Sequence, residues 1–256
     1  MNVFELDDYF KNLLNIDFFA KTDISQNGLQ VRNSGKPVKK IAFAVDACMQ
    51  TILLARERGA DMLFVHHGLF WSTPLLLTGN HYDRIKTLLD SDMALYAVHL
   101  PLDAHPVYGN NAELAERFNL KDKKEFGFYG NCAAGIYGSL PIEKTGISID
   151  EAIRCLFPCG EKPAHILPFG KKEIKTIGII SGAAAAKIDE AIRLNLDLYI
   201  TGEIGHSTYH TALENKINVI AGGHYQTETA GVKHVAKKLE SDTGIETCFL
   251  DVPTGL

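Results

Sequence analysis

The same order of strand, helix and strand occurs twice in this chain of 256 residues. Ile41 and Asp61 begin two short apolar runs, and Ile177 and Asp197 begin two similar runs at the same offset of 136 positions (177 − 41 and 197 − 61). Self-similarity at a fixed offset is typical of a duplicated structural unit. We therefore predict an α/β fold of two similar domains from an internal duplication, residues 1–125 and residues 126–256.

Polar side chains follow the predicted strands in both copies. His66 and His67 end the second strand of the first copy, and on the shared register His67 lies opposite Glu203 of the second copy. The third strands also correspond, since each is followed by a histidine and, four residues later, by a carboxylate. Carboxyl ends of parallel strands open onto the crevice where α/β sheets bind ligands. The full set at these strand ends is His66, His67, His99, Asp103, His105, Glu203, His206, His224 and Glu228.

Imidazole and carboxylate groups without thiolates are the ligand set of Zn²⁺, Mn²⁺, Fe or Ni²⁺ in hydrolytic sites. One metal ion needs three or four ligands, so this inventory is too rich for one ion and suits two. Glu228, four residues after His224, could bridge the two ions. The sequence therefore predicts two divalent metal ions per chain, in the cleft between the two domains.

Several single residues allow a second interpretation. Asp46 follows the first strand and is either a site carboxylate or the N-cap of a helix over residues 47–58. His105 precedes a proline, so its role could be no more than that of a turn cap. Phe70 and Trp71 are expected to anchor a loop. The remaining histidines are expected on the surface or on helices: His81, His165, His210 and His234.

Composition limits the class of protein. The net charge is −5, which argues against a dedicated nucleic-acid surface. The cysteine count is odd at five, so a disulfide framework is not expected. The N-terminus lacks a signal pattern, and no apolar run approaches the roughly 20 residues needed to span a bilayer. We expect a soluble cytoplasmic protein without a membrane partner.

The combination of motifs resembles one family, the GTP cyclohydrolase 1 type 2 homologs, also called Nif-three-like proteins. The resemblance runs nearly end to end and implies a dinuclear metal site, two α/β domains, and a ring-shaped homohexamer whose sites face an internal cavity. Its ligands would be His66, His67, Asp103, His224 and a bridging Glu228. The stretches that carry the resemblance are 26–31 (QNGLQV), 66–71 (HHGLFW), 99–103 (HLPLD), 201–203 (TGE), 222–228 (GGHYQTE) and 249–253 (FLDVP).

The function that this resemblance implies is metal-dependent hydrolysis of a small-molecule substrate. The expected reaction opens the purine ring of GTP to dihydroneopterin triphosphate and formate, with His99 or Glu203 transferring protons beside the metals. Two alternatives stay open, a metal-binding hexameric scaffold or regulatory protein, and a hydrolase of another nucleotide, phosphoester or amide. The native metal, the substrate and the roles of His105 and His206 are left undetermined by the sequence.

Overall fold

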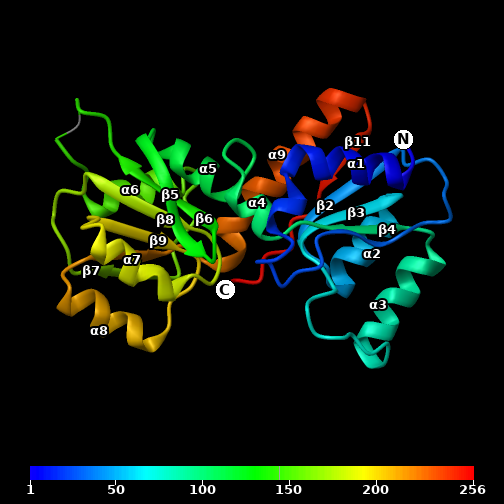
Figure 1. The fold of residues 1–256 in the computed structure, drawn as a ribbon, viewed down its shortest axis with the longest axis horizontal. Helices are drawn as coiled ribbons and strands as arrows, with labels where there is room; N and C mark the ends of the chain where they lie inside the picture. Colours follow the sequence, from blue (N-terminus) through cyan, green and yellow to red (C-terminus); the bar gives the residue numbers. More distant parts are fainter. Residues whose placement is uncertain (144) are drawn as a thin grey trace. The chain divides into compact units, whose positions relative to one another are not determined.

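The computed structural model describes residues 1–143 and 145–256, and its contacts divide the chain into two compact units (Figure 1). The first unit contains Met1–Leu102 and Gly231–Val252, and the second contains Asp103–Ala230 and Pro253–Leu256. The predicted halves, residues 1–125 and 126–256, have different limits. The physical reason is that residues 103–125 pack with the second sheet, whereas the last strand returns to the first.

The first unit is built on a five-stranded sheet in the order β1-β4-β3-β2-β11. Strands β4, β3, β2 and β11 are parallel, and β1 adds an antiparallel edge. The elements are α1 (Val3–Leu14), the 3₁₀ helix η1 (Ile16–Phe19), β1 (Gly28–Val31), β2 (Lys40–Asp46), α2 (Met49–Glu57), β3 (Met62–His67), α3 (Gly79–Asp90), β4 (Ala94–Ala97) and β11 (Glu246–Phe249).

Side chains alternate between the two faces of this sheet and build two layers of core. Phe43, Phe64 and Tyr96 stack on one face, where Phe10 of α1 packs with ring centroids 4.9 Å from both Phe64 and Tyr96. On the other face, small and aliphatic residues of the strands pack against α2 and α3. Figure 1 shows α1 and the pair α2 and α3 on opposite sides of the strands. Both faces are covered, as expected for parallel strands.

The second unit has a six-stranded sheet in the order β5-β6-β8-β9-β10-β7, with β8, β9 and β10 parallel. Helices α5 and α6 cover one face through an aliphatic cluster. The elements are α5 (Asn110–Arg117), β5 (Lys121–Tyr129), β6 (Cys132–Ser139), α6 (Ile149–Leu156), β7 (His165–Pro168), β8 (Thr176–Ile180), η2 (Ala185–Lys187), α7 (Ile188–Arg193), β9 (Leu198–Thr201), α8 (His206–Glu214) and β10 (Asn218–Ala221); α4 (Leu100–Ala104) and α9 (His224–Thr243) contain residues of both units.

The strand pairing confirms that the two α/β units are similar. Ile41 pairs with Met62 between β2 and β3, and Ile177 pairs with Leu198 between β8 and β9, with the same offset of 136 (177 − 41 and 198 − 62). Asp61 and Asp197 directly precede the second strand of each copy, and each accepts hydrogen bonds from two successive amides at the start of the first strand. An equal register and equivalent hydrogen bonds in both copies are expected of an internal duplication.

The ends of three helical segments are well defined. The N-terminal helix ends at Leu14, where Asn15 adopts a left-handed conformation and a 3₁₀ turn follows. The segment after β8 forms a 3₁₀ turn followed by the short α7. The N-cap of α2 is Cys48, so Asp46 is not that cap. Among the described residues, no helix is long and apolar enough to cross a membrane.

Candidate metal centre

Three imidazoles meet at the carboxyl ends of β3 and β4 in the first unit. His66 and His67 end β3, and His99 follows β4. Their rings lie 4.6 to 5.7 Å apart between centroids, and one ligand atom of each lies within 4.8 Å of the others. Adjacent residues of a strand normally face opposite ways, but here the strand ends and both rings converge. The predicted histidine pair is therefore part of a triad.

Each of these rings is fixed through its Nδ1 atom. His66 Nδ1 donates to the carbonyl oxygen of Val98 at 2.8 Å, and His67 Nδ1 donates to the Asp46 carboxylate at 2.8 Å. An acceptor at Nδ1 places the ring proton there and leaves the Nε2 lone pair to bind a cation. Such second contacts orient metal-binding histidines and raise their basicity. Asp46 therefore holds the ring of His67, which agrees with the first of the two interpretations that the sequence allowed.

His99 is held by a buried carboxylate from the N-terminal segment. Its Nδ1 donates to Asp23 at 2.8 Å, and its amide donates to the side chain of Asn27 at 2.7 Å. Burial opposes the charge on Asp23, but hydrogen bonds from His99, Asn27 and the Ser25 amide outweigh burial and lower the pKa of Asp23. The carboxylate therefore stays ionised and keeps His99 in one tautomer. Only a contact across 76 residues reveals this role, so the sequence did not indicate it.

The second unit has two buried carboxylates close to one another. Asp103 is buried, and its Oδ1 accepts hydrogen bonds from Ser181 Oγ at 2.8 Å and from Asn110 Nδ2 at 2.9 Å. Glu228 is buried on the first turn of α9, and an oxygen of each carboxylate lies within 4.8 Å of the other. Two buried carboxylates this close are costly unless a cation or a proton compensates them.

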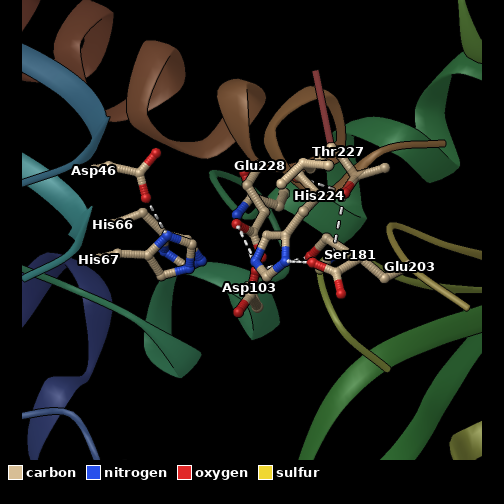
Figure 2. A network of polar contacts seen from close by, with 12 residues as sticks. Asp46, His66, His67, Asp103, Ser181, Glu203, His224, Thr227 and Glu228 are labelled. Carbon is tan, nitrogen blue, oxygen red and sulfur yellow. Dashed lines mark hydrogen bonds and ion pairs between the residues drawn. The ribbon is translucent and has the colours of Figure 1, made fainter. Parts of the chain in front are cut away.

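His224 lies between two acidic side chains in the same unit (Figure 2). Its Nδ1 donates to Glu203, and its Nε2 contacts Glu228 Oε2 at 3.1 Å. Burial lowers the pKa of His224, but the hydrogen bonds and charges of Glu228 and Glu203 outweigh burial and raise it to about 9. Without a metal, His224 is therefore protonated at neutral pH. The structure shows Glu203 as the partner that orients this ring.

Gly182 lies directly beside Glu228 and His224. Gly182 follows β8 with φ of +66°, and a Cβ added there would lie 2.2 Å from Glu228 Oε1 and 3.2 Å from His224 Nε2. No side chain fits at position 182 without displacing Glu228. The donor set, the Nδ1 anchors and this close approach all fit divalent metal ions. The cation would replace the proton that His224 shares with Glu228.

The other candidate residues make local contacts of their own. His105 Nδ1 accepts from the amides of Val107 and Tyr108, which is the turn cap that the sequence allowed. His206 is the first residue of α8, and its ring contacts that of His210. Trp71 donates through Nε1 to the carbonyl of Gly68, as expected of a loop anchor. Its ring also lies 5.1 Å from that of His99.

Comparison with known proteins identifies the family. The family model described as Duf34/NIF3 (NGG1p interacting factor 3) matches residues 1–255. The chain belongs to the Duf34/NIF3 family. A Treponema pallidum member named GTP cyclohydrolase 1 type 2 homolog is 51% identical, with both chains fully covered. Solved structures of the Duf34/NIF3 fold include protein ybgI, titled unknown function (31% identity, TM-score 0.90), and a Thermus thermophilus protein (36% identity, TM-score 0.87), each with full coverage of both chains.

Proposed function

We propose that this Duf34/NIF3 protein is a metal-dependent hydrolase that uses two divalent metal ions per chain. The proposed ligands are His66, His67, Asp103, His224 and Glu228. The observation that carries the proposal is the orientation of the histidines, since His66, His67 and His224 each have Nδ1 engaged by an acceptor. Histidines held in this way are typical of metal sites rather than of a solvated surface. The ion could be Zn, Mn, Fe or Ni, because nitrogen and oxygen ligands suit all four.

The proposed reaction adds water to C8 of GTP and opens the imidazole ring to a formamide, and a second water cleaves the formyl C–N bond to release formate. The ribose carbons then rearrange and condense with the freed amine, with loss of one water, to give dihydroneopterin triphosphate. The relatives named GTP cyclohydrolase 1 type 2 homolog support this substrate class. Two bound metals would supply Lewis acidity and lower the pKa of water. His99 would accept a proton from water at Nε2 and return it to the leaving nitrogen, while ionised Asp23 stabilises the imidazolium.

Glu203 was predicted as a second proton-transfer group, and this stays a prediction. Its contact with His224 supports an additional role, in which Glu203 orients a proposed metal ligand. Its side chain is 48% exposed, so the carboxylate can also exchange protons with solvent. The homohexamer and the cytoplasmic location implied by the family resemblance are part of the same proposal.

The decisive experiment measures metal and product together. Metal content of the purified protein is quantified by plasma mass spectrometry, and formate and pterin are assayed after incubation with GTP. Two ions per chain with stoichiometric formate and pterin is the expected result. Two ions per chain without product would overturn the GTP reaction and leave a scaffold or a different substrate. A chain that binds no divalent metal would overturn the whole proposal.

Asp23→Asn tests the role of His99 separately from metal binding. The amide keeps the size of the side chain but removes the charge that stabilises a protonated His99. Turnover should fall by about 10²-fold or more, with the metal content unchanged. Asp8→Asn, an exposed change in α1, serves as the control. A parallel loss of metal would show that Asp23 supports the metal centre rather than proton transfer.

A further inference from the structure

A hollow of about 300 Å³ adjoins Asp103 within the second unit. It lies between residues 103–112 and the hairpin of β5 and β6. Its volume is at the small end of ligand pockets, enough for one or two rings but not for a nucleoside triphosphate. Small apolar residues make up much of the wall: Ala104, Pro106, Ala112, Ala133, Ala134 and Ile136.

The wall of this hollow is rigidly constructed. Asn111 Nδ2 donates to the carbonyls of Asp103 at 3.2 Å and Ala134 at 2.6 Å, which ties the loop to β6. A Cβ at Gly109 would lie 2.3 Å from the carbonyl oxygen of His105, so the loop is wound as tightly as a glycine allows. A ligand would therefore meet a preformed surface, which lowers the entropic cost of binding.

His105 lines the hollow, and local contacts fix its tautomer. Its Nδ1 accepts from the amides of Val107 at 3.2 Å and Tyr108 at 2.9 Å, so its ring proton is on Nε2. The imidazole also stacks on Tyr108, with centroids 5.0 Å apart and planes at 26°. The turn cap thus fixes both the tautomer and the plane of the ring.

Glu125 supplies the opposing acceptor. It pairs directly with Ile136 across the hairpin, so both side chains lie on the same face. Within the described residues it has no hydrogen-bond or ion-pair partner. Because Lys123, Lys124, Asp103 and Glu125 line the hollow, its formal charges cancel. A wall with donors, acceptors and no net charge favours a neutral polar ring over a phosphate or a cation.

We propose that this hollow binds a purine-type heterocycle whose adjacent N–H groups are recognised by Glu125. Guanine presents two such donors on one edge, and a carboxylate accepts both. His105 Nε2–H would donate to an acceptor atom of the ring. The inference rests on the proposed function in one respect: Asp103 is a proposed metal ligand, so a ring held here lies beside the reacting centre.

The test is equilibrium binding of guanosine, inosine, adenosine and tripolyphosphate to the full-length, metal-loaded protein. Guanosine should bind tightest, inosine more weakly and adenosine weakest, and tripolyphosphate should not compete. Glu125→Gln should weaken guanosine binding by about tenfold or more, because a charged hydrogen bond is replaced by a neutral one. Glu161→Gln, an exposed change in the same unit, should have no effect. Ala133→Trp fills the hollow and should abolish binding.

The outcomes separate this inference from the proposed reaction. Guanosine binding that both hollow variants retain, or that tripolyphosphate displaces, would overturn the inference. If the wild type releases formate from GTP and Glu125→Gln leaves KM unchanged, the reaction stands and the inference fails. If the variants lose guanosine binding but the wild type forms no formate, the heterocycle site stands and the reaction is wrong.

Discussion

The two units share a scaffold but end their strands in different chemistry. Asp61 and Asp197 make the same amide contacts, whereas the equivalent positions 67 and 203 hold a histidine and a glutamate. In the first unit a carboxylate, Asp46, follows the first strand and orients a histidine at the end of the second. In the second unit the carboxylate follows the second strand and orients the histidine after the third.

The difference shows which parts of a duplicated fold are free to change. Hydrogen bonds at the amino ends of the strands hold the register, so both copies keep them. The carboxyl ends carry no such constraint, and each copy has its own polar side chains there. The first unit has imidazole nitrogens at these ends, and the second has mostly carboxylate oxygens. Under the proposed function, the imidazoles would supply directional ligands and the carboxylates would supply the charge that a divalent cation requires.

The largest effect should follow from removing a carboxylate of the second unit. Glu228→Gln removes a charge without changing shape, and the variant should lose bound metal and hydrolytic turnover together. Plasma mass spectrometry and a formate assay measure both losses. Glu214→Gln, an exposed change on α8, is the matched control. Retention of two ions by Glu228→Gln would mean that the charge of the second unit is dispensable.

Gly182→Ala should be the next most severe change. Position 182 corresponds to Asp46 of the first unit, but the side chain that fits in the first unit has no room in the second. The added Cβ would collide with Glu228, and the left-handed backbone adds about 1–2 kcal/mol of strain. Metal affinity and the melting temperature should both fall. Gly160→Ala has a similar positive φ but open space around it, so it isolates the backbone cost. Equal effects in the two variants would contradict the collision.

The carboxylates that orient histidines offer a milder comparison between the units. Asp46→Asn and Glu203→Gln should each weaken metal binding by about 10–100-fold, since such contacts tune ligand orientation and basicity. Titration calorimetry on the metal-free protein measures the affinity. Matched losses would show that both units anchor their histidines for the same purpose. If only Asp46→Asn loses metal affinity, then only the first unit uses a carboxylate to orient a metal-binding histidine.

The smallest expected effect is a change in the stability of the metal-free protein with pH. In the metal-free protein, the raised pKa of His224 means that the folded state holds this proton more tightly than the unfolded state does. The resulting stability is fully present below the unfolded value near 6.5 and is lost as pH rises through about 9. The melting temperature should therefore decline over this range, and apparent metal affinity should increase. His224→Gln should flatten the decline, and an unchanged decline would contradict this origin.

The duplication was predictable because both halves keep the same spacing, and the clustered histidines and carboxylates were predictable because they follow the repeated strands; their role as metal ligands stays a prediction. Edge strands β1, β7 and β11 were not predicted, since each has only four residues and pairs with a distant segment. The partners Asp23, Ser181 and Asn110 were also missed. Their roles depend on contacts across the fold, which no local pattern of residue types encodes.

The chain contains one tryptophan, and its indole ring lies 5.1 Å from His99 and 6.3 Å from His67. Intrinsic fluorescence of the whole protein therefore reports on a single place, the triad of the first unit. Excitation at the indole band needs no label and gives no signal from the second unit. A paramagnetic ion bound at the triad would quench this emission, whereas a diamagnetic ion would not. The Duf34/NIF3 chain thus contains its own optical probe for a metal ion bound at the triad.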